Sequence, residues 1–203
     1  NGQNDVYWRD THLKIEGDAV KSLQSQFLLN WSFVTDQEID IEEKYFPSVN
    51  FKANLPIQIV ASGPDSRWPY IMEAIFMAIN NAQKSIKITT PYFIPNDQIL
   101  TALKTASRSG VDVQIIIPKE GDSFAAKYAT YSYIEELLES GIRVFCYCKG
   151  MVHAKTIVID EQLSSIGTSN MDYRSFNINF EINALLFNDD FGKQMTEMFE
   201  RDL

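Results

Sequence analysis

The sequence of 203 residues lacks several features that would place it in a class at once. No apolar run approaches the roughly 20 residues that a membrane-spanning helix needs. There is no signal peptide and no initiating Met, and the first residues, Asn1 to Asn4, are typical of the interior of a longer sequence. We therefore expect a soluble piece excised from a larger protein.

Cysteine and positive charge are also scarce. The two cysteines, Cys146 and Cys148, cannot build a disulfide framework, and their spacing in an apolar run predicts buried thiols rather than a zinc site. The net charge of -9 and the pI of about 4.7 argue against a nucleic-acid partner, because binding a phosphate backbone takes clustered Lys and Arg. No Asp, Glu and His cluster has metal-ligand spacing, so we expect neither metal nor cofactor.

What is present is enough apolar and aromatic sequence, 45% and 12%, for a folded core. Composition divides the chain into residues 1–35, 36–54 and 55–203. The first part holds a strand-like stretch, Tyr7 to Glu16, and then a helix with Asp18 as its N-cap. The second part is acidic and irregular, which is typical of a linker with at most one ordered turn.

From residue 55 onward, strands and helices alternate. The expected strands are 57–61, 86–90, 111–117, 143–148, 153–159, 163–167 and 180–187, and the expected helices are 70–82, 97–109, 126–139 and 190–201. Such alternation predicts parallel strands with helices on both faces, and the short connections near the end add antiparallel pairs. The expected fold class is α/β, with a mixed β-sheet between helices.

The strongest chemical signal is the run His153-x-Lys155-x4-Asp160-x6-Gly167-Thr168-x-Asn170. At residue frequencies of roughly 5%, it should arise by chance about once in 10^8 starting points. It resembles the HKD motif of the phospholipase D superfamily, which continues to Gly-Ser/Thr-x-Asn. The resemblance implies a phospholipase D-like α/β sandwich and metal-free phosphoryl transfer through a phosphohistidine.

The residue types of this motif suit a phosphodiester. Side chains alternate along a strand, so His153 and Lys155 point the same way, and Thr168 and Asn170 follow on the next segment. Lys155, Thr168 and Asn170 are candidates to bind the non-bridging oxygens, where negative charge grows in the transition state. The imidazole of His153 can attack phosphorus or protonate the leaving alkoxide.

Three further residues are assigned by position. Asp160 has the opposite parity to the His and the Lys, so we assign it, with Gly167, a structural role at the turn. A catalytic imidazole needs a carboxylate to hold its tautomer. In the resemblance, a carboxylate at the offset of Glu181 pairs with the motif His, so we expect a His153–Glu181 pair. The alternative is a solvated strand residue.

The N-terminal part carries no second motif. His12-x-Lys14 has the first two positions, but no Asp follows at the required spacing. Instead, Trp8 to Leu13 resembles the segment after the first HKD motif of bacterial cardiolipin synthases. In that resemblance Asp10 serves the first-motif His, which would lie upstream of Asn1. Residues 1–35 would then be a remnant of a first phospholipase D-like domain and 55–203 the second.

Other runs carry the same resemblance: 90–95, 110–113, Pro118 with Asp122, 170–176 and 179–181. It implies a phosphatidyltransferase of the bacterial inner membrane that makes cardiolipin from two molecules of phosphatidylglycerol and releases glycerol. The first-motif His would be the nucleophile, and His153 the general acid and base. Membrane-binding parts would lie outside this sequence.

Several alternatives stay open. Tyr92 and Phe93 either contact substrate or pack, and Arg174 either meets a lipid phosphate or anchors a loop through Asp172. The chain is half of a cardiolipin synthase, part of a phospholipase D-type hydrolase or homodimeric nuclease, or an inactive fragment with an incomplete site. A homodimer could bring two copies of His153 together.

Overall fold

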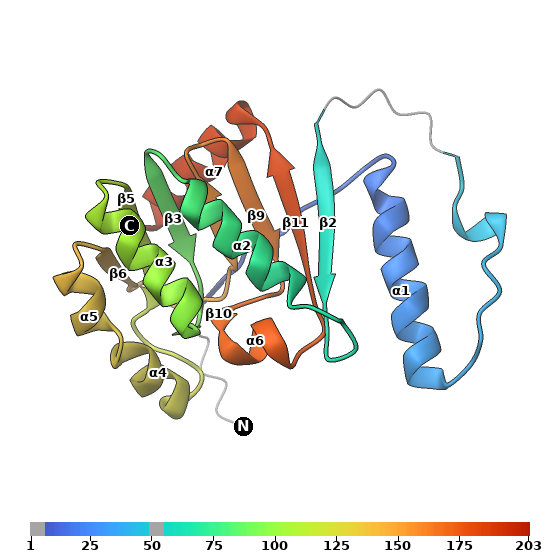
Figure 1. The fold of residues 1–203 in the computed structure, drawn as a ribbon, viewed down its shortest axis with the longest axis horizontal. Coiled ribbons are helices and arrows are strands. Elements are labelled where there is room, and N and C mark those ends of the chain that lie inside the picture. Colours follow the sequence, from blue (N-terminus) through green and yellow to red (C-terminus); the bar gives the residue numbers. More distant parts are fainter. Residues whose placement is uncertain (1–6, 49–54) are drawn as a thin grey trace.

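A computed structural model describes residues 7–48 and 55–203. Its centre is a seven-stranded sheet with the order β2-β11-β9-β8-β3-β5-β6 (Figure 1). The strands are β2 (Ile57–Ser62), β3 (Ser85–Thr89), β5 (Asp112–Pro118), β6 (Arg143–Tyr147), β8 (Thr156–Ile159), β9 (Leu163–Gly167) and β11 (Glu181–Phe187). Strands β3, β5 and β6 are parallel, whereas the pairs from β2 to β3 are antiparallel. The predicted mixed sheet is confirmed.

Helices cover both faces of this sheet. In Figure 1, α2 (Tyr70–Asn81) and α3 (Asp97–Arg108) lie in front of the strands and α7 (Asp189–Asp202) lies behind them. The alternation along β5 shows why both faces are apolar. Ile115 and Ile117 pack with α2 and α3, whereas Ile116 joins the cluster that includes Phe199 of α7. Burying such a side chain contributes roughly 1.5–3 kcal/mol, so both layers are held by the hydrophobic effect.

The helix expected over residues 126–139 is wrong in one respect, because it is two helices, α4 (Phe124–Tyr131) and α5 (Ile134–Glu139). At the break, the hydroxyl of Ser132 donates to the carbonyl of Ala129, and the amide of Tyr133 donates to the carbonyl of Thr130 at 3.2 Å. In both bonds the acceptor lies three residues before the donor, as in a 3-10 helix, and not four as in an α-helix. The tighter turn ends α4.

The strand expected over Tyr7 to Glu16 is reduced to β1 (Trp8–Arg9). It pairs in parallel with β7 (Met151–Val152), just before the motif. The amide of His153 extends this pairing by donating to the carbonyl of Arg9 at 2.8 Å. Arg9 also forms an ion pair with Asp202 of α7, at 2.7 Å. The N-terminal segment is thus attached to the body that carries the motif.

The helix α1 (Ala19–Thr35) stands beside the edge strand β2 (Figure 1). Asp18 precedes it but makes no side-chain capping bond. After it, the expected single ordered turn is found as the 3-10 helix η1 (Glu43–Tyr45), and residues 49–54 of the predicted linker lie outside the described residues. Within the described ranges, no helix has the length and apolar character needed to cross a membrane.

The prediction of buried cysteines is wrong. Both Cys146 and Cys148 are exposed, and the thiol of Cys148 contacts the carbonyl of Cys146 at 3.2 Å. Cys146 lies in β6, at the edge of the sheet, and Cys148 follows the end of that strand.

The turn between β8 and β9 contains Asp160 and Glu161, whose φ angles of 55° and 58° are left-handed. The carboxylate of Asp160 accepts hydrogen bonds from the backbone amides of Gln83, Lys84 and Ser85, at 2.8, 2.7 and 2.8 Å. These amides lead into β3, so Asp160 joins the motif hairpin to the neighbouring strand, which is a structural position.

Replacing Asp160 by Ala should lower the free energy of unfolding by roughly 2–4 kcal/mol, because three backbone donors lose a charged acceptor. Urea denaturation of the chain measures this. Glu197→Ala, at an exposed position on α7, is the matched control and should change the stability by less than about 0.5 kcal/mol. Equal effects of the two variants would contradict the structural role of Asp160.

Candidate active site

His153 lies between β7 and β8, and its imidazole is held from two sides. Nδ1 is 2.9 Å from Oδ2 of Asp10, and the ring meets the indole of Trp8 edge-on, with centroids 5.2 Å apart. The expected His153–Glu181 pair is therefore wrong. Because β1 runs beside β7, the residue after β1 reaches the residue after β7, so Asp10 takes the place that was assigned to Glu181.

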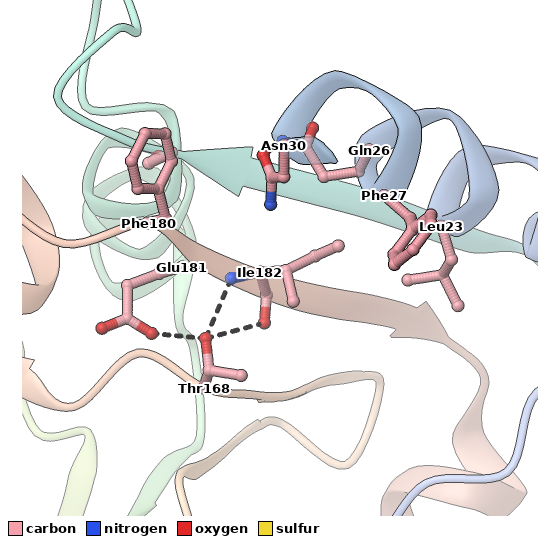
Figure 2. Close-up of a pocket in the computed structure, with 9 residues that line it drawn as sticks. Leu23, Gln26, Phe27, Asn30, Thr168, Phe180, Glu181 and Ile182 are labelled. Atoms are coloured by element: carbon pink, nitrogen blue, oxygen red, sulfur yellow. Dashed lines mark hydrogen bonds between the residues drawn. The ribbon is translucent and has the colours of Figure 1, made fainter. Parts of the chain in front are cut away.

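Glu181 has other partners at the start of β11. Its carboxylate accepts a hydrogen bond from the hydroxyl of Thr168 and another from Nδ2 of Asn179, at 3.1 Å. Figure 2 shows Thr168 between Glu181 and Ile182, whose backbone amide donates to the Thr168 hydroxyl oxygen at 2.9 Å. The hydroxyl hydrogen of Thr168 is thus used on Glu181.

Lys155 is the half-buried cation of the site. Its ammonium donates to the backbone carbonyl of His153. Burial lowers the pKa of Lys155 below its usual range, and nearby carboxylates oppose this shift without cancelling it. Those carboxylates are Asp10, Glu181, Asp122 and Asp172. Four separate segments therefore bring negative charge close to one lysine.

The pKa of Asp10 reflects the same neighbourhood. Partial burial raises it, but hydrogen bonds from His153 and the Thr11 amide, with the charges of His153 and Lys155, outweigh burial. The net pKa of Asp10 lies below its ordinary value of 3.8. The carboxylate is held ionised beside the imidazole, as an orienting partner requires.

Asn170 follows β9 and is fixed by its own neighbours. Nδ2 donates to Oδ2 of Asp172 at 3.2 Å, and the backbone amide donates to the hydroxyl of Ser175 at 3.2 Å. Oδ1 of Asn170 is buried, and no hydrogen-bond partner exists for it among the described residues. An unsatisfied buried acceptor costs stability, and such costs are found at functional positions.

Gly167 has a steric role. A Cβ atom at this position would lie 2.2 Å from Oδ1 of Asn183 and 2.4 Å from the carbonyl oxygen of Ile182. Only glycine therefore lets β9 approach β11 closely enough for Thr168 to reach Glu181.

The two aromatic candidates, Tyr92 and Phe93, have different environments. Phe93 is 1% exposed and packs edge-on against Tyr133, so packing describes it. The hydroxyl of Tyr92 donates to Oδ1 of Asp122 at 2.6 Å. Burial, together with this carboxylate, raises the pKa of Tyr92 to about 12.

Cavities border several of the motif residues, and two of them matter for the site. One of about 290 Å³ lies between α1 and β11, and Leu23, Phe27, Thr168 and Glu181 line part of it (Figure 2). The other, of about 560 Å³, includes Asn170 in its lining. It is also lined by Tyr92, Ile94, Ser123, Ala126, Asp172, Tyr173, Arg174 and Asn179.

Sequence reasoning missed the partners that depend on tertiary contact. The Asp10–His153 and Tyr92–Asp122 pairs join segments that no periodicity connects. Asp10 carried a signal in its resemblance to a segment that follows an HKD motif, but the partner inferred for it was wrong. Among residues 7–48 and 55–203, no group of three His, Cys, Asp or Glu is arranged to hold a metal ion.

Comparison with known proteins gives the geometry a family. Residues 75–203 match the family model described as cardiolipin synthase, PLD-like domain. A cardiolipin synthase of Listeria monocytogenes serotype 4a (strain HCC23) is 42% identical over 198 residues, and one of Staphylococcus aureus (strain Mu50 / ATCC 700699) is 44% identical over the same length. Each alignment covers 97% of this chain, and 41% and 40% of the respective relative. The chain thus spans about two fifths of the length of these relatives.

Solved structures show the same fold at low sequence identity. Nuc from Salmonella typhimurium, a phospholipase D family member, has a TM-score of 0.61 at 24% identity, over 73% of this chain and 94% of that one. The phosphatidylserine synthase of Haemophilus influenzae Rd KW20 has a TM-score of 0.58 at 15% identity, over 94% of this chain and 47% of that one. With a family model that matches more than half of its residues, the chain belongs to the cardiolipin synthase family of PLD-like domains.

Proposed function

We propose that this chain is the C-terminal catalytic part of a membrane phosphatidyltransferase, which joins two molecules of phosphatidylglycerol into cardiolipin and releases glycerol. The observation that carries the proposal is the Asp10–His153 hydrogen bond, together with Lys155, which lies two residues after His153. An oriented imidazole beside a half-buried cation is what the transfer of a phosphodiester needs. Membership of the cardiolipin synthase family supports this reaction class.

His153 acts as the general acid and then as the general base. With Nδ1–H donated to Asp10, Nε2 is left to move a proton. In the first step a nucleophilic histidine forms a P–N bond, the P–O bond to glycerol breaks, and Nε2 of His153 gives the glycerol oxygen its proton. In the second step Nε2 takes the proton from the acceptor hydroxyl, whose oxygen bonds to phosphorus as the P–N bond breaks.

Lys155 and Asn170 stabilise the charge that develops on the non-bridging oxygens. Nδ2 of Asn170 has a second hydrogen beyond the one donated to Asp172. Thr168 has a different role from the phosphate contact first assigned to it, because its hydroxyl hydrogen is donated to Glu181. It therefore positions a carboxylate.

The nucleophilic histidine belongs to a first motif outside this sequence. Asp10, which follows that motif in the resemblance, serves His153, so by the same geometry Glu181 is assigned to the first-motif histidine. The curated relatives are more than twice as long as this chain, which leaves room for such a motif. A second copy of His153 in a homodimer is the alternative source.

Replacing His153 by Ala in the full-length protein should abolish cardiolipin formation, because no group then moves the proton. Conversion of phosphatidylglycerol to cardiolipin and free glycerol measures this, with His12→Ala as the control that retains activity. If phosphatidic acid is the main product of the unchanged protein, the enzyme is a hydrolase and the transferase proposal fails.

Replacing Asp10 by Asn should lower kcat by roughly 10²–10⁴-fold with a smaller effect on KM, because the imidazolium loses its charged partner. Asp18→Asn, at an exposed position near the same end of the described chain, should have little effect. A rise in KM with an unchanged kcat would contradict the role of Asp10.

The same pair predicts a pH dependence of stability. Because the pKa of Asp10 is lowered in the folded protein, its contribution is present above its unfolded pKa of about 3.9 and is lost as the pH falls through the folded pKa. The difference in unfolding free energy between the Asp10→Asn variant and the unchanged chain should therefore shrink below about pH 4. A difference that is constant from pH 7 to pH 3 would contradict this.

The chain alone should be inactive towards phosphatidylglycerol, since one imidazole cannot be nucleophile and acid on opposite sides of phosphorus. Product analysis combined with sedimentation tests this. Turnover by a dimeric form of the chain would favour the homodimer, and turnover by the monomer would rule out the shared site.

A further inference from the structure

The larger cavity beside Asn170 has a distinct chemical character. It lies where β4 (Phe93–Ile94) pairs with β10 (Met171–Asp172), at the carboxyl end of the parallel strands, between the starts of α4 and α6 (Tyr173–Asn177). Its lining combines one cation, Arg174, with the hydroxyl of Ser123 and the amides of Asn170 and Asn179. The one carboxylate in the lining, Asp172, already accepts hydrogen bonds from Asn170 and from the Ser175 amide. Such donors suit an anionic, hydroxylated ligand.

Arg174 is not used by the fold. Its side chain is exposed, and in the described part of the chain it has neither an ion pair nor a hydrogen bond from its guanidinium. The loop anchor through Asp172 is not formed, because that carboxylate accepts from the Ser175 amide at 2.7 Å and from Nδ2 of Asn170 at 3.2 Å. Arg174 is therefore available to a ligand in the cavity.

The reaction creates a need for such a cation. Two phospholipids meet in the second step, and each carries a phosphate. Lys155 and Asn170 serve the phosphate that is transferred, whereas the acceptor keeps its own phosphate at the other end of a three-carbon glycerol. Four carboxylates act on the charge of Lys155, and one of them, Asp172, also lines the cavity, so they oppose the binding of a second anion. Without another positive group, the acceptor would bind poorly.

We propose that this cavity is the acceptor subsite, in which Arg174 binds the phosphate of the second phospholipid while its terminal glycerol hydroxyl points towards Asn170. The proposal rests on the proposed function and adds to it the residue that distinguishes a lipid acceptor from a neutral alcohol. A guanidinium can bind two phosphate oxygens in parallel, which also fixes the direction of the glycerol.

Tyr92 and two apolar residues also line the cavity. The Tyr92 hydroxyl donates to Asp122, which fixes the position of the ring, and its oxygen keeps a lone pair that can accept a hydrogen bond. Ile94 and Ala126 add apolar surface beside it. This arrangement fits a glycerol chain with one polar edge and one apolar edge.

The test compares two acceptors in the full-length protein carrying Arg174→Gln. Cardiolipin formation uses a phosphorylated acceptor, whereas the exchange of labelled glycerol into phosphatidylglycerol uses a neutral one and the same donor. We expect cardiolipin formation to fall roughly 10- to 100-fold, the range for losing one charge-assisted hydrogen-bond partner, and glycerol exchange to fall less than threefold. Arg174→Lys should recover part of the cardiolipin rate because it keeps the charge.

The controls separate the outcomes. Arg201→Gln, at an exposed position in α7, should change neither rate. An equal loss of both rates in Arg174→Gln would place Arg174 on the donor phosphate or in the fold, and no loss of either would make it a surface residue; both results overturn the proposal. If the unchanged protein forms no cardiolipin, the proposed function fails and the subsite falls with it.

Discussion

The hydrogen bond between His153 and Asp10 joins residues 143 positions apart, and the organisation of the site depends on it. It exists because β1 pairs in parallel with β7, and the ion pair from Arg9 to Asp202 fastens the same segment to α7. Both side chains of that ion pair are largely buried, so it can contribute more to stability than an exposed pair, which contributes little. Backbone pairing places the carboxylate, and the carboxylate orients the imidazole.

Electrostatics then decide what the site can bind. Asp10, Glu181, Asp122 and Asp172 act on the single cation Lys155, so this half of the site has an excess of negative charge. A phosphodiester is repelled by such a surface unless further cations complete it. In the proposed function, a first motif outside this sequence would supply them for the transferred phosphate. Arg174, which lines the same cavity as Asn170, is the cation that we propose for a second phosphate.

Much of the fold could be predicted because its signals are local. The strand β9 has the expected bounds, and β2, α2, α3 and β5 differ from the expected ones by a residue or two. The predictions that failed concern residues whose surroundings are formed by segments distant in the sequence. The exposed cysteines lie in the edge strand β6 and just after it. In the N-terminal segment, Trp8 and Arg9 form a strand because they pair with β7. Neither fact is encoded in a window of sequence.

The wrong assignment of Glu181 to His153 also arose because the sequence does not show tertiary contacts. The correct partner, Asp10, bears on how the chain divides into domains. An offset along the sequence pointed to Glu181, but sheet order places β11 beside β9, where Glu181 meets Thr168. The predicted boundary at residues 36–54 follows composition and stays a prediction. Leu13 and Ile15, on its N-terminal side, pack against the cluster that contains Val158 and Ile166 of the motif hairpin. The C-terminal part expressed without residues 1–35 would lack Asp10 and these contacts, so the functional unit includes chain from both sides of the compositional boundary.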